Sequence, residues 1–100
     1  MCYTQFLNVI SKATLMQQTK RHDSADLTAK VIRWFKLAKV NRFENFLEVK
    51  QVFPQTDLVG EKLVFNLGSY RLIVGFSFLR QDFYIKALLT HREYDKGDWK

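Results

Sequence analysis

Apolar residues recur with two different periods along this chain. Over residues 27–38 they return every three or four positions, which is typical of an amphipathic helix, whereas the period is poor between residues 11 and 22. Ser11 can cap a first helix that runs to about His22, and Asp23 or Ser24 can cap a second. The second helix has the clearest apolar stripe, formed by Leu27, Val31, Trp34, Phe35 and Ala38. We therefore predict two helices before residue 40.

Shorter elements flank these helices. Residues 6–10, FLNVI, are apolar enough to form a first strand. Asn45 followed three positions later by Glu48 predicts a capping box that opens a short helix, and Pro54 must end it. The stretch QTDLVGE at 55–61 is interpreted as a turn or loop.

Beyond residue 61 the apolar period becomes two, as in strands. Three alternating runs follow one another: EKLVFNLG, SYRLIVGFSF and DFYIKALL. Gly68-Ser69 and Arg80-Gln81 connect them tightly, so an antiparallel meander is expected. The predicted class is α+β, with an N-terminal strand and helices packed on the meander and a short C-terminal helical turn. One domain is expected over residues 8–100, and residues 1–7 are interpreted as a leader that adds little to the fold.

Strand alternation also predicts which residues share a face of this sheet. The apolar face toward the helices is expected to hold Leu63, Phe65, Leu67, Leu72, Val74, Phe76, Phe83, Ile85, Ala87 and Leu89. Lys62, Arg71 and Lys86 then share the opposite face, where the alternation places no acidic residue. Three cations on one face suit a bound anion such as a phosphodiester. A solvated, charged sheet face is the alternative.

Charge and composition narrow the class of partner and the compartment. The chain has 100 residues, 47% of them hydrophobic, a net charge of +6 and a pI near 9.6. Such a balance favours polyanionic partners. The longest apolar run is too short to span a bilayer, the start does not resemble a secretory signal, and the single cysteine, Cys2, allows no disulfide within the chain. These features predict a cytoplasmic protein without a membrane segment.

Most of the excess positive charge lies in the helical half. The first fifty residues hold nine Lys and Arg against four Asp and Glu, and the second fifty hold seven against six. Lys30, Arg33 and Lys36 are expected to spread over the solvent side of the second helix and to contact RNA phosphates. An ordinary solvated helix face is the alternative interpretation of these three residues.

The stretch LTHREYDKGDWK at 89–100 gathers the most chemistry. Thr90 and Glu93 predict a capping box, and Gly97 can end the short helix that it opens. Glu93 is therefore interpreted as structural. His91 occupies the first helical position, with Tyr94 and Asp95 on the same side of the turn. His91 and Tyr94 thus project beside the strand that carries Lys86.

This combination suits a ribonuclease that works without a metal. Such an enzyme needs one group to take the 2′-hydroxyl proton, another to protonate the leaving 5′-oxygen, and cations to stabilise the phosphoryl charge. His91 suits either proton-transfer role, Arg71, Lys86 and Lys62 suit charge stabilisation, and Tyr94 can stack on a base. No cluster of acidic or histidine residues has ligand spacing, so no metal and no cofactor is expected. Alternatively, His91 is a surface residue and Tyr94 packs the terminal turn.

The run VFPQTDLVGEKLVFNLGSYRLIVGFSF, followed by FYIKALLTHREYDKGDWK, resembles the HigB-type toxins of bacterial type II toxin–antitoxin systems. The pattern THxEYDKGxWK and Arg71, three positions after the glycine of VFNLG, carry the resemblance, which runs from about Asn8 to Lys100. It implies a RelE-like fold, a messenger RNA endoribonuclease (mRNA interferase) that acts on the translating ribosome, and a cognate helix-turn-helix antitoxin bound in a hetero-oligomer. Arg92 and Lys96 join the expected RNA-binding residues.

Two other functions remain open from the sequence. One is a non-catalytic module that binds RNA or the ribosome with the same fold. The other is a partner-binding protein whose basic surface serves only an acidic antitoxin.

Overall fold

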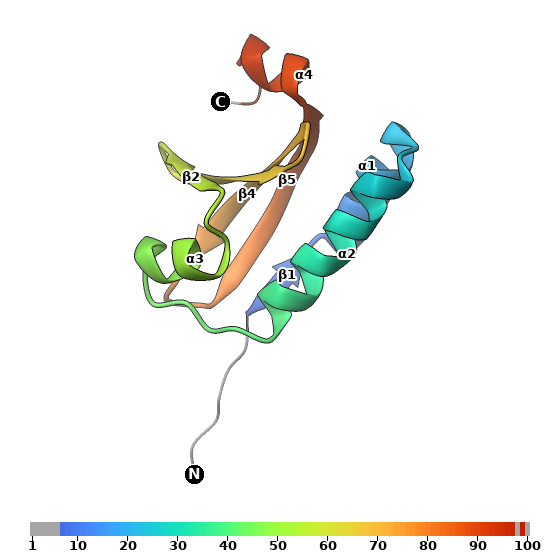
Figure 1. Cartoon of the computed structure of the whole chain (residues 1–100). Coiled ribbons are helices and arrows are strands. Elements are labelled where there is room, and N and C mark those ends of the chain that lie inside the picture. Colours follow the sequence, from blue (N-terminus) through green and yellow to red (C-terminus); the bar gives the residue numbers. More distant parts are fainter. Residues whose placement is uncertain (1–6, 98, 100) are drawn as a thin grey trace.

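Helices precede the sheet along the chain, as the change of period predicts. The computed structural model describes residues 7–97 and 99 (Figure 1). Strand β1 is followed by three helices, four further strands and a terminal helix. The bounds are β1 Asn8–Ile10, α1 Lys12–His22, α2 Ala25–Lys39, α3 Phe46–Val52, β2 Thr56–Val59, β3 Lys62–Leu67, β4 Tyr70–Ser77, β5 Asp82–Thr90 and α4 His91–Lys96. The predicted α+β class is thus observed.

Side-chain caps explain where α2 and α3 begin. The Ser24 hydroxyl accepts a hydrogen bond from the Leu27 amide at 3.2 Å, and the Asn45 side chain accepts one from the Glu48 amide at 3.0 Å. The box predicted at Asn45 is only half formed, because the Glu48 carboxylate accepts from the Glu44 amide instead. Ser11 begins α1 in a left-handed conformation, φ 72°, and its side chain makes no capping hydrogen bond.

Figure 1 shows α1 and α2 side by side against one face of the sheet, with α4 beyond the end of β5. The predicted stripe of α2 packs into the core, where Leu27, Val31 and Ala38 are fully buried. Trp34 lies at its centre, with ring centroids 5.3 Å from Phe65 and 6.2 Å from Phe83. Burial of these apolar surfaces is the main force holding the helices to the sheet.

Leu7 corrects one part of the predicted leader. Its side chain is only 3% exposed and belongs to the core, and its amide donates to the Asn41 carbonyl at 3.1 Å. The expectation that residues 1–7 add little to the fold therefore fails for Leu7. Residues 1–6 lie outside the described part of the chain.

The sheet has the strand order β1-β5-β4-β3-β2. The predicted meander is confirmed: β3, β4 and β5 pair antiparallel in sequence. The turn or loop expected at 55–61 is wrong, because Thr56–Val59 forms β2 and pairs with β3. β1 pairs parallel with β5, but only over Asp82–Tyr84.

A register shift in β5 changes the predicted faces. Val74 pairs with Ile85 and Ile73 pairs with Ala87, so Lys86 is an extra residue in β5 without an opposite partner in β4. Beyond it the alternation reverses. Leu88, rather than Ala87 or Leu89, is fully buried in the core beneath the helices. The faces predicted for Ala87, Leu88 and Leu89 are thus wrong, and the cause is this bulge.

Gln81 connects the loop that follows α2 with the turn between β4 and β5, at the end of β5 opposite α4. It is fully buried and has a positive φ of 58°. Its side-chain oxygen accepts from the Phe43 amide at 2.8 Å, while its side-chain nitrogen donates to the Phe43 and Phe78 carbonyls. The loop after α2 is thereby fixed to the turn between β4 and β5.

Candidate functional site

Helix α4 is held at the end of β5 by the predicted capping box. The Thr90 hydroxyl accepts from the Glu93 amide at 3.1 Å, and the Glu93 carboxylate accepts from the Thr90 amide at 3.0 Å. Gly97 ends the helix in the left-handed conformation, φ 77°. The His91 amide also donates to the Ser69 carbonyl at 3.1 Å. These bonds place the first turn of α4 against the β3–β4 turn.

Arg71, His91 and Tyr94 meet at this junction. A guanidinium nitrogen of Arg71 lies 3.3 Å from His91 Nδ1, and its central carbon lies 5.9 Å from the centre of the Tyr94 ring. The other terminal nitrogen of Arg71 donates to the Gly68 and Tyr70 carbonyls, both at 3.1 Å. The guanidinium is therefore oriented by the β3–β4 turn before any ligand arrives.

The contacts of His91 select one tautomer. Arg71 can only donate hydrogen bonds, so Nδ1 of His91 must be the acceptor in their contact. The proton of a neutral ring is then on Nε2, which lies 3.1 Å from Oδ2 of Asp95. The predicted placement of Asp95 beside His91 is thus observed. This aspartate contacts the imidazole from the side opposite Arg71.

Sequence reasoning did not assign a role to Trp99, which lies against the same cluster. Its ring stacks on Tyr94 with centroids 4.9 Å apart, and its indole nitrogen donates to the Tyr94 carbonyl at 2.8 Å. Tyr94 thus contacts Trp99 as well as Arg71. The WK ending of the quoted motif was the available signal for this residue.

Lys62 and Lys86 lie on the same face of the sheet as Arg71, but they lie beside Gly75. Lys62 pairs with Gly75 across β3 and β4, and a Cβ placed on Gly75 would come within 3.1 Å of Lys86 Cε. Arg71 lies four positions away along β4, about 13 Å at the usual rise per residue. Buried Val64 and Ile73 pair between the two positions. The predicted five-residue site is therefore divided into an Arg71–His91–Tyr94 cluster and a Lys62–Lys86 pair.

The predicted face without acidic residues is wrong. Asp57 of β2 pairs with Val64 and so lies on the Lys62 face, exposed to solvent. Asp82 is two positions before Tyr84 in β5 and therefore lies on the same face of the sheet. Its carboxylate accepts a hydrogen bond from the Tyr84 hydroxyl at 3.2 Å and one from the Asn8 side chain at 3.3 Å. Both aspartates lie toward the edges of the sheet. The face is thus of mixed charge, although its described cations outnumber its carboxylates.

The residues expected to bind RNA do not form one surface. Lys30 is paired with Asp26 one turn earlier and packs against Gly68 of the β3–β4 turn. Lys30 and Arg33 line a hollow of about 330 Å³ beside this turn, whereas Lys36 lines a groove between α1 and α2. Arg92 and Lys96 are exposed on α4. The five residues thus lie in three separate places.

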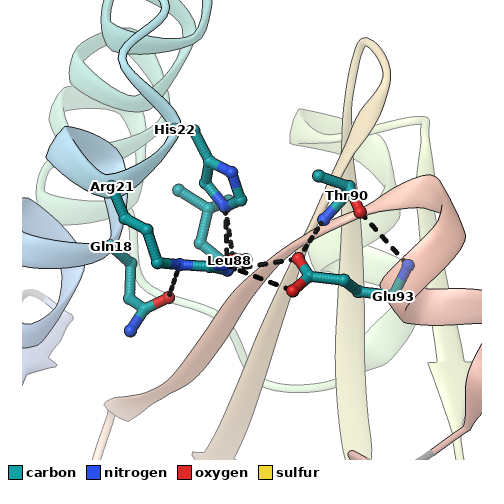
Figure 2. A network of polar contacts seen from close by, with 6 residues as sticks. All are labelled: Gln18, Arg21, His22, Leu88, Thr90 and Glu93. Carbon is teal, nitrogen blue, oxygen red and sulfur yellow. Dashed lines mark hydrogen bonds and ion pairs between the residues drawn. The ribbon is translucent and has the colours of Figure 1, made fainter.

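Glu93 does more than cap its helix. Figure 2 shows Arg21 of α1 reaching both of its carboxylate oxygens, each at 3.2 Å. Hydrogen bonding from Arg21, then from the Thr90 amide, lowers the pKa of Glu93 from 4.5 to about 2. The carboxylate is therefore more stable as an anion in the folded protein than in the unfolded chain.

Replacing Glu93 by Gln should lower the melting temperature in a pH-dependent way. Because folding lowers the pKa of Glu93 from 4.5 to about 2, its ionic contribution is complete above pH 4.5 and disappears as the pH falls toward 2. The gap between parent and Glu93→Gln melting temperatures should therefore narrow across that interval. Glu61→Gln, an exposed change in the β2–β3 turn, is the matched control. A gap that stays constant from pH 7 to pH 2 would contradict this linkage.

Residues 7–97 and 99 contain neither a candidate metal site nor a candidate membrane-spanning helix. No group of three or more His, Cys, Asp or Glu side chains in that part could hold a metal ion. No helix there is both long enough and apolar enough to cross a bilayer.

The fold and cluster define a small basic α+β protein with a preoriented arginine, a histidine and a stacked tyrosine at one end of its sheet. Residues 27–97 match the family model of the HigB toxins, described as the RelE-like toxic component of a toxin–antitoxin system. Because this match spans most of the sequence, the chain belongs to the HigB toxin family. Its helices and five-stranded mixed sheet agree with a RelE-like fold. Membership in this family implies an antitoxin partner. A comparison with curated protein sequences gave no match.

Proposed function

We propose that this toxin is a metal-independent messenger RNA endoribonuclease that acts on the translating ribosome. The observation that carries this proposal is the Arg71–His91–Tyr94 cluster. It brings an anion-binding guanidinium, an imidazole and an aromatic ring to one place. RelE-like family membership supports the same class of activity.

In this mechanism the 2′-hydroxyl oxygen attacks the neighbouring phosphorus, and the bond from phosphorus to the 5′-oxygen breaks. Arg71 binds the phosphoryl oxygens and stabilises the charge that grows on them. One terminal nitrogen of Arg71 exchanges its contact with Nδ1 of His91 for the phosphate, while the Gly68 and Tyr70 carbonyls keep the guanidinium in place. The freed Nδ1 takes the proton of the 2′-hydroxyl, and water supplies the proton that the leaving 5′-oxygen takes up. Asp95 contacts the opposite ring nitrogen. Stacking with Tyr94 holds a base beside the cluster.

Lys62 and Lys86 have a different role in this proposal. Their backbone positions lie about 13 Å along the strand from Arg71, beside Gly75. They contact phosphates on the same RNA strand away from the cleavage point. Arg92 and Lys96 on α4, with Lys30, Arg33 and Lys36 on α2, supply further phosphate contacts with the message or ribosomal RNA.

The protein acts in the cytoplasm, where translating ribosomes are found. Its antitoxin carries a helix-turn-helix domain and forms a hetero-oligomer with the toxin. No cofactor takes part.

Controlled expression in a bacterial host tests the function directly. We expect growth arrest on induction, together with new message ends that primer extension maps inside translated regions. His91→Ala should remove these ends while the protein still accumulates in folded form, because it removes the proton-transfer group. Purified protein should cleave ribosome-bound message in EDTA. Loss of cleavage in EDTA with ribosomes intact would overturn the metal-free mechanism.

The same experiment separates the alternative function. A non-catalytic binding module would co-sediment with ribosomes and could slow growth, but it would leave messages intact in both parent and His91→Ala. Intact messages in the parent at full growth arrest would therefore reject the endoribonuclease and favour the binding module.

A further inference from the structure

β5 is paired with β4 throughout, but among the described residues its outer edge lacks a strand along the half that leads into the candidate site. β1 pairs with it only over Asp82–Tyr84, so from Ile85 onward its outer edge has no paired strand among the described residues. Exposed peptide groups on such an edge need other hydrogen-bond partners. Helix α1 packs against β5 and supplies such partners to the Leu88 carbonyl.

Two residues at the end of α1 converge on one peptide group of this edge. The Leu88 carbonyl accepts from Arg21 at 3.1 Å and lies 2.8 Å from Nε2 of His22 (Figure 2). Both donors point at the same oxygen, which explains why Arg21 and His22 also lie within 3.1 Å of each other. The His22 ring packs against Tyr70, with centroids 4.8 Å apart. The end of α1 is thus fixed against both β4 and β5.

Arg21 continues from this edge to α4. Its Nε atom donates to Gln18 at 3.2 Å, which fixes the plane of the guanidinium. The two terminal nitrogens then reach the two oxygens of Glu93, and one of those oxygens also accepts from the Thr90 amide. A two-pronged arginine–carboxylate contact restrains orientation as well as distance. One side chain therefore connects α1, the end of β5 and the first turn of α4.

We propose that Arg21 is a positioning residue that holds α4, and with it His91 and Tyr94, in register with Arg71. This inference rests on the proposed function and extends it to a residue outside the family match, which begins at residue 27. His91 and Tyr94 belong to the same short helix as Glu93, whereas Arg71 belongs to β4. A shift of α4 changes their separation from Arg71 without changing any residue of the cluster.

Single-turnover cleavage of ribosome-bound message tests the proposal. Arg21→Ala should lower the maximal rate by about tenfold or more, because small displacements of reacting groups are costly. The ribosome concentration giving half-maximal rate should change little. Arg21→Lys keeps the positive charge but cannot contact both oxygens of Glu93 with two donors in one plane, so it should recover part of the rate. Lys20→Ala, which removes a neighbouring exposed cation, should cleave at the parent rate.

A double-mutant cycle with Glu93→Gln identifies the path of the effect. If Arg21 acts through Glu93, the double variant should be no slower than Arg21→Ala alone. If the rate losses of the two single variants multiply in the double variant, Arg21 does not act through Glu93. A folded Arg21→Ala protein that cleaves at the parent rate would overturn the proposal itself.

Amide hydrogen exchange in the isolated protein keeps this inference separate from the proposed function. In Arg21→Ala the Glu93 and Gly97 amides of α4 should exchange about tenfold faster, while amides in the β3–β4 ladder keep the parent rate. Absence of cleavage by the parent protein would reject the enzyme but not the positioning of α4. Unchanged exchange in α4 would reject the positioning whatever the parent protein does to RNA.

Discussion

Replacing Arg71 by Ala is expected to slow message cleavage by about a hundred- to a thousandfold while the protein stays folded. The guanidinium is the strongest anion-binding group of the cluster and is already oriented by the Gly68 and Tyr70 carbonyls. A preoriented donor stabilises the transition state without the cost of reorganisation at the moment of reaction. Its loss should therefore affect the rate more than ribosome binding.

The measurement is single-turnover cleavage beside a melting curve for each variant. Arg71→Lys keeps one positive charge but cannot bind two phosphoryl oxygens in one plane, so we expect an intermediate rate. Arg42→Ala removes an exposed arginine from the loop before α3, where it pairs with Glu44, and serves as the matched control. Parent-like cleavage by folded Arg71→Ala would show that the site lies elsewhere.

Replacing Gln81 by Leu is expected to cost about 2–6 kcal/mol of folding free energy, since it leaves the Phe43 amide and carbonyl without their side-chain partner. Each buried polar group left unpaired costs about 1–3 kcal/mol. In a domain of this size the melting temperature should fall by at least about 8 °C. Little effect on cleavage at low temperature is expected, because Gln81 lies at the opposite end of β5 from α4.

A second substitution separates hydrogen bonding from backbone strain. Gln81 has a positive φ of 58°, which glycine adopts more readily than leucine. Gln81→Gly therefore relieves strain but still loses the side-chain hydrogen bonds. We expect it to be destabilised as well, whereas Leu79→Ala in the same turn, at a side chain 93% exposed, should match the parent. A Gln81→Gly protein as stable as the parent would show that the hydrogen bonds contribute no more than the strain that glycine relieves.

Much of this fold could be predicted from local sequence signals. The stripe of α2, the Ser24 cap, the three-stranded meander and the Thr90–Glu93 box all depend on residues close together in the chain. β2 was not predicted, because its four residues lie beside Gly60 and resemble a turn. Only their pairing with β3 makes them a strand. The bulge in β5 was not predicted either, because the single extra residue, Lys86, changes the pairing with β4 without interrupting the apolar run.

The candidate site was predictable in its members but not in its grouping. His91, Tyr94 and Asp95 share one turn of helix, so their proximity follows from the capping box. The separation of Lys62 and Lys86 from Arg71 depends on position along the strand, which alternation alone does not report. Arg21 lay beyond local reasoning altogether, because 72 positions separate it from Glu93.

The pairing of β1 with β5 also sets an order for folding during synthesis. Asn8 and Asp82 are 74 positions apart, so β1 cannot pair with β5 until all of the chain between them has been synthesised. Domains generally fold as units, and contacts between distant residues form late because the long loop must close first. The α1–α2 hairpin can form early, but the sheet that receives it cannot. The Arg71–His91–Tyr94 cluster therefore comes into being only after residue 94 has left the ribosome that makes it.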